Sequence, residues 1–306
     1  MSKFVEFIEH NGVKAVKRFS RDFAADMEYP RSVKERFVLP LLTDKKLCVP
    51  RLLEIGEDFL IQEFIDGELL GDIYKGKTLE FQDIDRRIID QIVDNIVGLA
   101  KVDAGPLEQR MPWKNNQEFF LTQLNNTQKI FKKYYGQLGT IYNKLNIKEN
   151  ILDGFYNRAT KIDNARPMVL IHGDRHKENM ILKNGQVYFI DWELAHCGDL
   201  AYDIAFHLHQ MDYSRQDEKY FLESIRQKLP PQQMSSMNDL DLYRDFCMAR
   251  SALFHVYHTD LYYTNKKTTL NYDQVAHFTK RYNMLDQRIK FGAKPKTPNQ
   301  VQNIFK

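Results

Sequence analysis

Three polar side chains in the middle of this 306-residue chain have the types and spacing of a phosphoryl-transfer site. Asn179 follows Asp174 after five residues, and a second carboxylate, Asp191, follows after twelve more. Phosphoryl transfer needs a base at the acceptor hydroxyl and oxygen ligands for Mg²⁺ beside the nucleotide phosphates. The spacing of Asp174 and Asn179 is that of a kinase catalytic loop, although Gly173 stands where protein kinases carry Arg. We therefore predict that Asp174 is the base and that Asn179 and Asp191 bind the metal.

Short strands on both sides of this loop are expected to hold the three groups together. Residues 167–171 form an apolar run that predicts a strand leading into the loop. Residues 180–190 predict a β-hairpin with a tight Asn-Gly turn, and its returning strand would bring Asp191 back beside Asn179. Asp and Asn also cap turns without any chemistry. The succession of strand, loop, hairpin and carboxylate favours the catalytic interpretation over capping.

The composition is that of a globular protein with one large core or two lobes. Hydrophobic residues make up 43% of the chain and charged residues 28%, and the net charge of +3 is too small to indicate a nucleic-acid partner. No apolar run is long enough to span a bilayer, and charges interrupt the N-terminal residues where a secretory signal would be apolar. Three widely spaced cysteines indicate a reducing compartment. We expect a cytoplasmic protein with no membrane or nucleic-acid partner, and the sequence does not indicate the oligomeric state.

The first 66 residues have the pattern of a small β-rich lobe. Asn11-Gly12 is a strong hairpin signal, and Pro40 is expected to end or kink the helix in which it lies. We place the boundary between lobes after residue 66, giving a nucleotide-binding lobe over 1–66 and a lobe with the catalytic loop and acceptor site over 67–306. The expected elements of the first lobe are strands over 4–10, 13–19, 51–55 and 59–65 and a helix over 32–42.

The second lobe is predicted to be mainly helical. Isoleucines from Ile84 to Ile96 recur every fourth residue, which is the apolar stripe of a helix that faces a core. Residues 291–306 hold two prolines and many polar residues and are expected to form a loose tail. The fold class is therefore α+β, with two lobes. Helices are expected near 116–138 and 147–163, and over 200–211, 215–228, 240–263 and 272–289.

A kinase also needs a cation on the phosphates, and Lys17 is the candidate in the second strand. Strand alternation puts Ala15 and Lys17 on one face, as in the V-A-I-K strand of kinases, where the Lys reaches the α- and β-phosphates. A surface lysine is the alternative. A helix glutamate normally holds this lysine. Glu35 is our choice for that role, and Glu28, which precedes the Pro30 break, is the second candidate.

Main-chain groups between the lobes are expected to hold the adenine. Residues 60–65 form an apolar run that ends at Asp66-Gly67, which predicts a buried strand leading into the connector. Backbone atoms of Glu63 and Ile65 are the predicted contacts.

Two further motifs have a structural interpretation. We expect Asp199 to cap the next helix, and we favour a packing role for Asp203 over the alternative that it supports the catalytic loop. His172 and His176 are four residues apart, but they lie in a predicted loop rather than on the helix face that an H-E-x-x-H zinc site needs. We therefore discount a zinc hydrolase and expect His172 to brace the loop.

Taken together, these motifs resemble the aminoglycoside phosphotransferase and choline kinase-like superfamily of small-molecule kinases. The resemblance covers most of residues 13 to 210. It rests on His172-Gly-Asp-x4-Asn179, Ile190-Asp-Trp-Glu193, Gly198-Asp-x3-Asp203-Ile-Ala, Val49-Pro50 and Phe64-Ile-Asp-Gly67.

The resemblance implies a protein-kinase-like, two-lobed fold that binds ATP and Mg²⁺. By this resemblance Asp174 is the catalytic base, Asn179 and Asp191 bind Mg²⁺, Lys17 binds phosphate and Glu35 pairs with Lys17. It also implies a small hydroxylated acceptor, which could be aminoglycoside-like or carry another amine.

The chain departs from the kinase pattern before the phosphate-binding strand. Only one strand precedes that strand, and Gly12 is the sole glycine there, so no G-x-G-x-x-G occurs. Either the first strand and the Gly-rich loop are lacking, or Asn11-Gly12 stands in for them. The loss of backbone N–H donors is expected to weaken nucleotide binding or to leave that task to side chains.

Three functions compete on these grounds. A small-molecule kinase accounts for Asp174, Asn179 and Asp191 together, whereas a weak or inactive kinase-like protein would account for the missing loop. A protein kinase is disfavoured, because few residues separate Asp191 from the next helix and no A-P-E occurs.

The C-terminal helices carry acidic and tyrosine side chains that would suit a cationic acceptor. The simpler and favoured interpretation is that these are solvated carboxylates and core tyrosines. The residues are Asp212, Tyr213, Asp239, Asp241, Tyr243, Asp245, Tyr257, Asp260, Tyr262 and Tyr263.

Overall fold

A computed structural model describes most of the chain. The helix expected over 272–289 and the tail expected over 291–306 lie outside the described residues except at isolated positions, and Glu28 lies outside them. The described residues are 5–19, 31–43, 47–74, 84–109, 111–211 and 213–265, together with 279, 283, 297 and 300.

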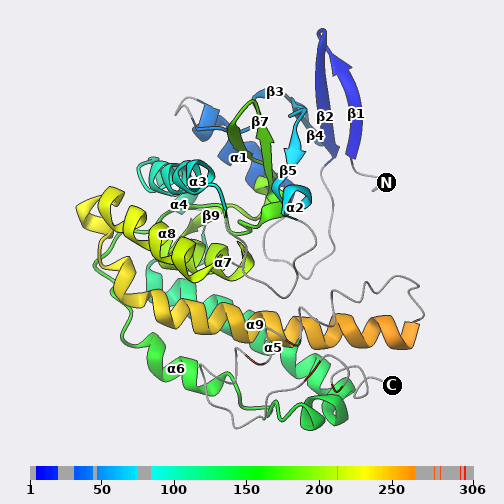
Figure 1. Ribbon diagram of the computed structural model, residues 1–306, viewed down its shortest axis with the longest axis vertical. Coiled ribbons are helices and arrows are strands. Elements are labelled where there is room, and N and C mark those ends of the chain that lie inside the picture. Colours follow the sequence, from blue (N-terminus) through cyan, green and yellow to red (C-terminus); the bar gives the residue numbers. More distant parts are fainter. Residues whose placement is uncertain are drawn as a thin grey trace.

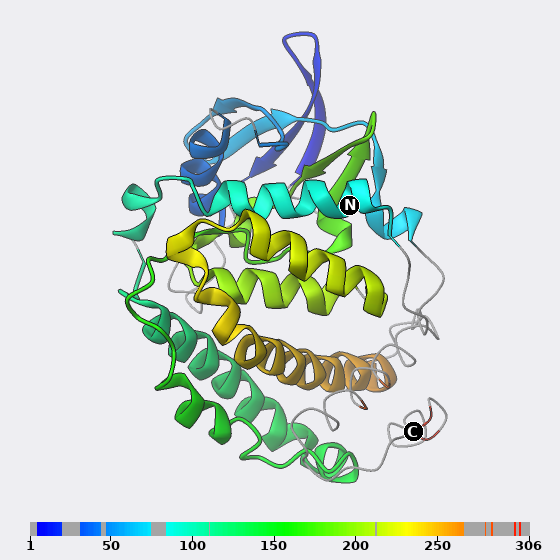
Figure 2. The same ribbon diagram turned by 60° about the vertical axis from the view of Figure 1, so that its left-hand side comes forward.

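Four antiparallel strands form the sheet at the top of Figure 1. Asn11 and Gly12 join the first two strands with φ values of 51° and 77°, and positive φ at both central residues is the geometry of a type I′ turn. The predicted hairpin is confirmed, and it projects from the body of the molecule in Figures 1 and 2. The strands are β1 (Val5–His10), β2 (Val13–Phe19), β3 (Leu52–Ile55) and β4 (Phe59–Glu63), in the order β1-β2-β4-β3.

One helix, α1 (Arg31–Thr43), lies beside this sheet and continues through Pro40. The helix therefore does not end at Pro40, which was one of the two expected outcomes. The proline is exposed, whereas the side chains of Val38, Leu39 and Leu42 are fully buried. Burial of each of these three side chains contributes about 1.5–3 kcal/mol. Their sum exceeds the roughly 3 kcal/mol that one proline costs in a helix interior.

Short strands and many helices make up the rest of the chain. β5 pairs with β7, β7 pairs with β8, and β6 pairs with β9. The strands are β5 (Glu68–Leu69), β6 (Val169–Ile171), β7 (Met180–Lys183), β8 (Gln186–Phe189) and β9 (His196–Gly198). The helices are α2 (Leu70–Ile73), α3 (Arg86–Leu99), α4 (Gly105–Glu108), α5 (Asn116–Lys144), α6 (Asp153–Ala159), α7 (Leu200–Met211), α8 (Arg215–Lys228) and α9 (Ser236–Asn265), with 3-10 turns η1 (Lys177–Asn179), η2 (Trp192–Leu194) and η3 (Pro231–Gln233).

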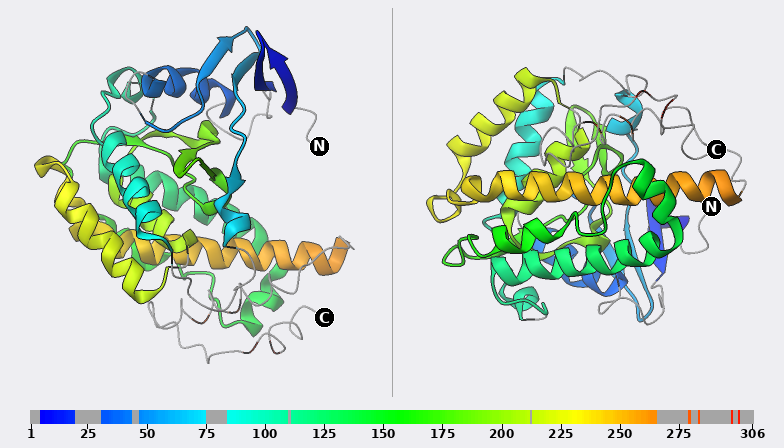
Figure 3. Two further views of the ribbon diagram at one scale, coloured as in Figure 1. Left: turned by 45° about the horizontal axis from the view of Figure 1, so that its top comes forward. Right: turned by 90° about the horizontal axis from the view of Figure 1, so that it is seen from below.

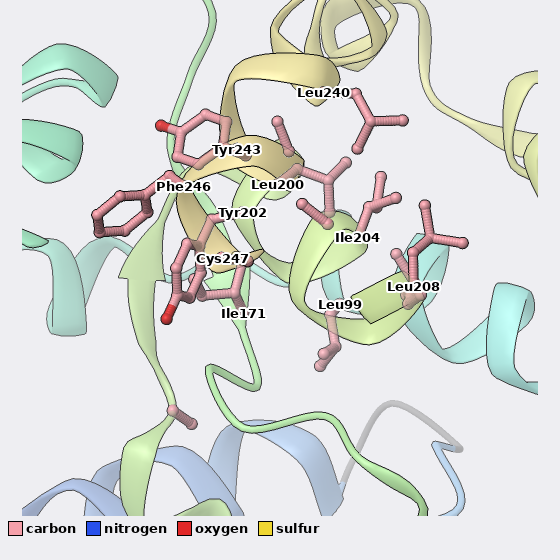
Figure 4. Packing of buried hydrophobic residues seen from close by; sticks show 14 of the residues in the cluster. Leu99, Ile171, Leu200, Tyr202, Ile204, Leu208, Leu240, Tyr243, Phe246 and Cys247 are labelled. Carbon is pink, nitrogen blue, oxygen red and sulfur yellow. The ribbon is translucent and has the colours of Figure 1, made fainter. Parts of the chain in front are cut away.

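The helices are stacked beneath the sheet, as Figure 2 shows. α9 runs across the molecule in both views of Figure 3. Its side chains pack on α7, where Tyr202 and Ile204 of α7 lie near Tyr243 and Phe246 of α9 in Figure 4. The predicted stripe of α3 is buried from Ile88 to Ile96. These contacts make α7 a buried platform directly behind the catalytic loop.

Strand pairing changes partner between β4 and β5. β4 belongs to the four-stranded sheet, whereas β5 pairs with β7, which follows the catalytic loop. This change of pairing partner agrees with a boundary between lobes after residue 66. The division into lobes over 1–66 and 67–306 remains a proposal.

Candidate active site

The catalytic loop lies between β6 and β7. The three residues of β6 are buried, and the chain leaves this strand at His172. After Asn179 the chain enters the β7–β8 hairpin, which turns at Asn184 and Gly185 with φ values of 52° and 77°. The N–H of Ile190 then donates to the carbonyl of Asn179 at 3.0 Å. The predicted hairpin thus returns the chain, and Asp191 follows directly.

One oxygen of the Asp174 carboxylate is held by two donors. Asn179 Nδ2 lies 3.2 Å and His176 Nε2 3.3 Å from Oδ2 of Asp174. Among the described residues, no hydrogen bond reaches the other oxygen, Oδ1. Burial raises the pKa of Asp174, but His176, His172 and Asn179 outweigh burial and hold this pKa below its usual value. The carboxylate is therefore ionised at neutral pH, with Oδ1 available to a hydroxyl.

Asp191 has left-handed backbone angles, with φ 62° and ψ 66°. This region is uncommon for residues other than glycine, although Asp tolerates it better than most. The side chain is 35% exposed, and its Oδ1 lies 2.9 Å from Arg18 Nη2. Carboxylate and amide oxygens are the ligands that Mg²⁺ prefers, and in kinases phosphate oxygens and water supply the rest. Asp191 and Asn179 fit that incomplete ligand set.

No group of three or more His, Cys, Asp and Glu side chains in the described part of the chain could hold a metal by itself.

Among the described residues, the cation that contacts Asp191 and Glu35 is Arg18 and not Lys17. Nη1 of Arg18 lies 3.2 Å from Glu35, and its Nη2 lies 2.9 Å from Asp191. Nζ of Lys17 lies instead over the Phe59 ring, 4.1 Å from its centroid, and 4.8 Å from that of Phe19. The predicted pairing of Lys17 with Glu35 is wrong. Neighbouring strand residues point to opposite faces, and the face of Arg18 is the one that meets the site.

The sequence did carry a signal for Arg18. Val16-Lys17-Arg18 repeats the small-x-cation pattern of V-A-I-K one residue later than Ala15-Val16-Lys17. The alignment of the V-A-I-K pattern with Lys17 is therefore one residue away from the alignment with Arg18.

Glu35 is the glutamate of α1 that reaches the site. It is 2% exposed, and its Oε1 accepts a hydrogen bond from the N–H of Trp192 at 3.1 Å as well as the ion pair from Arg18. Burial raises the pKa of Glu35 to about 7, against the lowering effect of Arg18. Glu35 therefore ties α1 to the turn that carries Asp191.

A third carboxylate, Glu193, lies in the same place; it belongs to the motif Ile190-Asp-Trp-Glu193, but we assigned it no role of its own from the sequence. Its Oε2 lies 3.4 Å from Arg18 Nη2. We call Arg18, Glu35, Asp191 and Glu193 the Arg18 cluster. Among the described residues, this cluster contains one cation and three carboxyl groups. The side chains of Asp191 and Glu193 are partly exposed, so their carboxylates are accessible to a ligand.

A second group, which we call the Arg175 cluster, supports the catalytic loop from behind. It consists of Arg175, Asp203, Asn95 and Phe189. Asp203 accepts from the backbone N–H of Gly173 at 3.0 Å and from Arg175 Nε and Nη2 at 3.2 and 3.1 Å. Arg175 Nη1 also donates to Asn95 at 2.9 Å, and its guanidinium lies over the Phe189 ring. Asp203 therefore supports the loop, which corrects our preference for packing alone.

His172 and Asp199 have the structural roles that we expected. Nε2 of His172 lies 3.0 Å from the carbonyl of Ile190, and its ring packs on Trp192. Burial and the charge of Arg175 lower the pKa of His172 to about 4, so the ring is neutral. Asp199 accepts from the N–H of Ala201 at 2.9 Å, which is the bond of a helix cap.

The connector between β4 and β5 contains the residues predicted to contact adenine. The N–H of Glu63 donates to the carbonyl of Arg51 at 2.8 Å. Among the described residues the N–H of Ile65 has no backbone partner. Ile65 is therefore the better placed of the two for donating to a base, and both remain predictions.

The acceptor residues suggested by the sequence lie mostly in structural pairs. Tyr213 bonds to His207, and Tyr243 bonds to Asp199. Asp239 and Asp245 pair with arginines. The favoured interpretation, core tyrosines and carboxylates without a binding role, fits these four. The side chains from Tyr257 onward and Asp212 lie outside the described residues.

Sequence comparison identifies the family. Residues 7–238 match the APH phosphotransferase enzyme family, a span of more than half the chain. The chain belongs to this family. The match confirms the predicted superfamily and makes the chain a member of a phosphotransferase enzyme family.

Two curated relatives are both described as "Protein LicA homolog". The one from Metamycoplasma hominis is 35% identical over 91 residues, which cover 28% of this chain and 35% of the relative. The one from Mycoplasma capricolum is 26% identical over 176 residues, covering 57% and 60%. In both cases the match spans less than two thirds of the relative's length.

Solved structures with the same fold include kinases for different acceptors. Aminoglycoside phosphotransferase APH(4)-Ia has a TM-score of 0.58 at 19% identity, covering 95% of this chain and 90% of that one. Choline kinase LicA from Streptococcus pneumoniae has 0.52 at 16%, covering 95% and 90%. Plasmodium vivax ethanolamine kinase has 0.54 at 17%, covering 92% and 81%. At these identities the likeness shows the fold alone, and it confirms the predicted two-lobed α+β class.

None of the helices in the described ranges is both long and apolar enough to cross a membrane.

Proposed function

We propose that this protein is an ATP- and Mg²⁺-dependent kinase that phosphorylates the hydroxyl of a small amino alcohol of the choline class. The observation that carries the proposal is the arrangement of Asp174, which is ionised and has one oxygen free of the described donors, beside Asn179 and Asp191. The amino alcohol is suggested by the curated relatives, because the protein named LicA among the solved structures is a choline kinase.

Each side chain has a distinct role in the proposed transfer. Oδ1 of Asp174 accepts the hydrogen bond of the acceptor hydroxyl and takes its proton as the oxygen attacks the γ-phosphorus of ATP. The bond between this phosphorus and the β,γ-bridging oxygen breaks, and ADP leaves with that oxygen. Asn179 and Asp191 would hold Mg²⁺, which neutralises charge on the phosphates when bound. Arg18 binds phosphate oxygens, and Glu35 holds the guanidinium in position. Phosphoryl transfer depends mainly on such positioning and electrostatic stabilisation.

Arg18 also bears on the missing Gly-rich loop. The Asn11–Gly12 turn is at the tip of a hairpin that projects from the molecule in Figure 1. It is therefore poorly placed to stand in for a phosphate loop. The guanidinium, with its five N–H donors, can supply phosphate contacts that backbone N–H groups make in other kinases.

A weakly active or inactive nucleotide-binding protein is the second candidate. It is favoured by the absence of a Gly-rich loop from the described residues. The intact Asp174, Asn179 and Asp191 argue against it, because a protein without catalysis has no need of all three.

An ADP-release assay with Mg·ATP tests the proposal. We expect choline or ethanolamine to raise the rate above that without acceptor, and aminoglycosides to do so less. Asp174→Asn should lower kcat by about 10²–10⁴-fold, because the base is lost. A Glu223→Gln variant on the surface of α8 is the matched carboxylate-to-amide control and should keep the wild-type rate.

Thermal unfolding with nucleotide separates the two candidate functions. A ligand that binds only the folded state stabilises it by about 2.7 kcal/mol at one hundred times its Kd. We expect a Mg²⁺-dependent rise in Tm with ATP that Asp174→Asn retains and Asp191→Ala loses. A Mg²⁺-dependent rise with no transfer to any acceptor would favour the inactive protein instead.

A further inference from the structure

Three alternate residues of the catalytic loop form a continuous chain of polar contacts. Nε2 of His176 lies 3.3 Å from Oδ2 of Asp174, and Nδ1 of the same ring lies 3.0 Å from Oε2 of Glu178. Both ring nitrogens of His176 therefore face carboxylates. A ring held at both ends has a fixed orientation, whereas a ring with one partner can rotate or flip.

The contacts at Asp174 determine which oxygen of its carboxylate is available to the acceptor hydroxyl. His176 and Asn179 both lie against Oδ2, from opposite ends of the η1 turn. A carboxylate with one oxygen held by two donors cannot rotate without breaking both contacts. This leaves Oδ1 as the oxygen that faces the acceptor hydroxyl in the proposed reaction.

Glu178, the last residue in this run of polar contacts, lies beside Gly71 of α2. A Cβ at Gly71 of α2 would lie 3.0 Å from Cγ and 3.2 Å from Cδ of Glu178. A larger residue at position 71 would therefore require the Glu178 side chain to shift by a few tenths of an ångström. Glu178 lies between α2 and His176, which it contacts through Oε2.

His176 differs in charge from the other histidine of the loop. Burial would lower the pKa of His176, but its hydrogen bonds to Asp174 and Glu178 raise it to about 9. His172 lies near Arg175 and is neutral. The two histidines of the loop therefore differ in charge.

We infer that His176 is a positioning residue for the base Asp174, and that Glu178 of η1 orients His176. The inference rests on the proposed kinase function and adds two residues to its machinery. His176 acts through Asp174 and does not itself touch the reacting atoms. The alternative is a partly exposed ion pair of the loop surface without a role, since such pairs often contribute little.

The test compares His176→Ala, His176→Gln and Glu178→Gln with the wild-type enzyme. We expect His176→Ala to lower kcat by about 10²-fold, the effect of a small misplacement of a catalytic group. The KM for ATP and the Tm should change little, because neither the phosphate contacts nor the core is touched. His176→Gln keeps a donor toward Asp174 and should recover part of kcat, and Glu178→Gln should lose less than His176→Ala. His10→Ala, on the projecting hairpin, is the matched control.

A double variant decides whether His176 acts through the base. In the Asp174→Asn background, the further change His176→Ala should lower kcat by less than twofold, because residues that act as a unit are not additive. A full second loss there would overturn the inference and indicate direct contact with the phosphates. A wild-type kcat in His176→Ala, or a parallel fall of kcat and Tm, would also overturn it. If the wild-type enzyme transfers phosphate to no acceptor, the proposed function itself fails, and the inference fails with it.

Discussion

The two arginine clusters around the catalytic loop differ in charge balance and in contact with water. Arg18 is 18% exposed and faces three carboxyl groups, two of which are also accessible. Arg175 has no exposed side-chain surface, and it is matched by one carboxylate, one amide oxygen and an aromatic ring. Both clusters lie beside the same loop, one toward the sheet and one toward α7.

We interpret the accessible Arg18 cluster as a site for a ligand and the buried Arg175 cluster as a support for the loop. Both charges of the support are paired, although Nδ2 of Asn95 has no hydrogen-bond partner among the described residues. Buried charges are stable when they are paired and their hydrogen bonds are satisfied, as they are for Arg175 and Asp203.

In the Arg18 cluster, Asp191 and Glu193 are partly exposed and are accessible to a Mg²⁺ ion that binds with a nucleotide. Burial, together with the charges of Asp191 and Glu193, raises the pKa of Glu35 to about 7 despite the ion pair with Arg18. We therefore expect changes in the Arg18 cluster to affect activity and changes in the Arg175 cluster to affect stability.

The largest effect is expected for Arg18→Ala. Loss of a guanidinium that stabilises phosphoryl-transfer charge should lower kcat/KM for ATP by about 10³-fold, or about 4 kcal/mol. Steady-state kinetics with varied ATP measure this loss. Lys17→Ala is the matched control, because Lys17 lies over Phe59 and Phe19, and it should change kcat/KM by less than threefold. A larger loss in Lys17→Ala than in Arg18→Ala would restore our original choice and remove the basis of the comparison.

The next effect is expected for Arg175→Leu, and it concerns folding. Removing one partner of a buried ion pair typically costs about 3–5 kcal/mol, because the other charge is left uncompensated. We expect the lower end of this range, because Asp203 keeps its bond from the N–H of Gly173. Denaturant unfolding measures the cost. Arg175→Leu with Asp203→Asn should be more stable than Arg175→Leu alone, since the unpaired charge is removed. If Arg175→Leu unfolds like the wild type but loses the Mg·ATP shift, the clusters do not divide as we describe.

Local patterns in the sequence predicted several elements closely. α7 and α8 occupy residues 200–211 and 215–228 as expected, and both Asn-Gly hairpins formed. These elements have strong local signals, namely apolar periodicity, a cap and a turn that needs positive φ. The catalytic loop belongs to this group, because Asp174 and Asn179 are close in sequence and share a short turn.

Contacts between distant segments could not be predicted in the same way. Strand alternation defines two faces of β2, but only the packing of α1 and η2 decides which face meets the site. This is why Lys17 was chosen in place of Arg18. Likewise, Asp203 reaches the loop from α7, and no spacing rule connects an aspartate of one helix with backbone N–H groups thirty residues before it.

The smallest expected effect is a pH dependence of the free energy of unfolding. It tests whether water reaches the Arg175 cluster. His207 of α7 is fully buried near Arg175, Asp203 and Tyr213. Burial, reinforced by Arg175, lowers the pKa of His207 to about 3. The unfolded chain takes up a proton below pH 6.5, whereas the folded protein does not until about pH 3, so the free energy of unfolding falls as the pH falls between these values. At pH 5 the loss from this one histidine is about 2 kcal/mol.

Urea unfolding of the wild type and His207→Gln at pH 7 and pH 5 measures this contribution. Glutamine can still donate toward Tyr213 but does not titrate, so the variant should lose about 2 kcal/mol less than the wild type between the two pH values. The quantity to compare is the difference between the two proteins in the free energy of unfolding that each loses from pH 7 to pH 5. The pKa of His172 is also lowered, and it contributes to this loss in both proteins in the same direction. Equal losses would mean that His207 accepts a proton in the folded protein. Water would then reach the neighbourhood of Arg175, and the contrast between a dry support and an accessible ligand site would not hold.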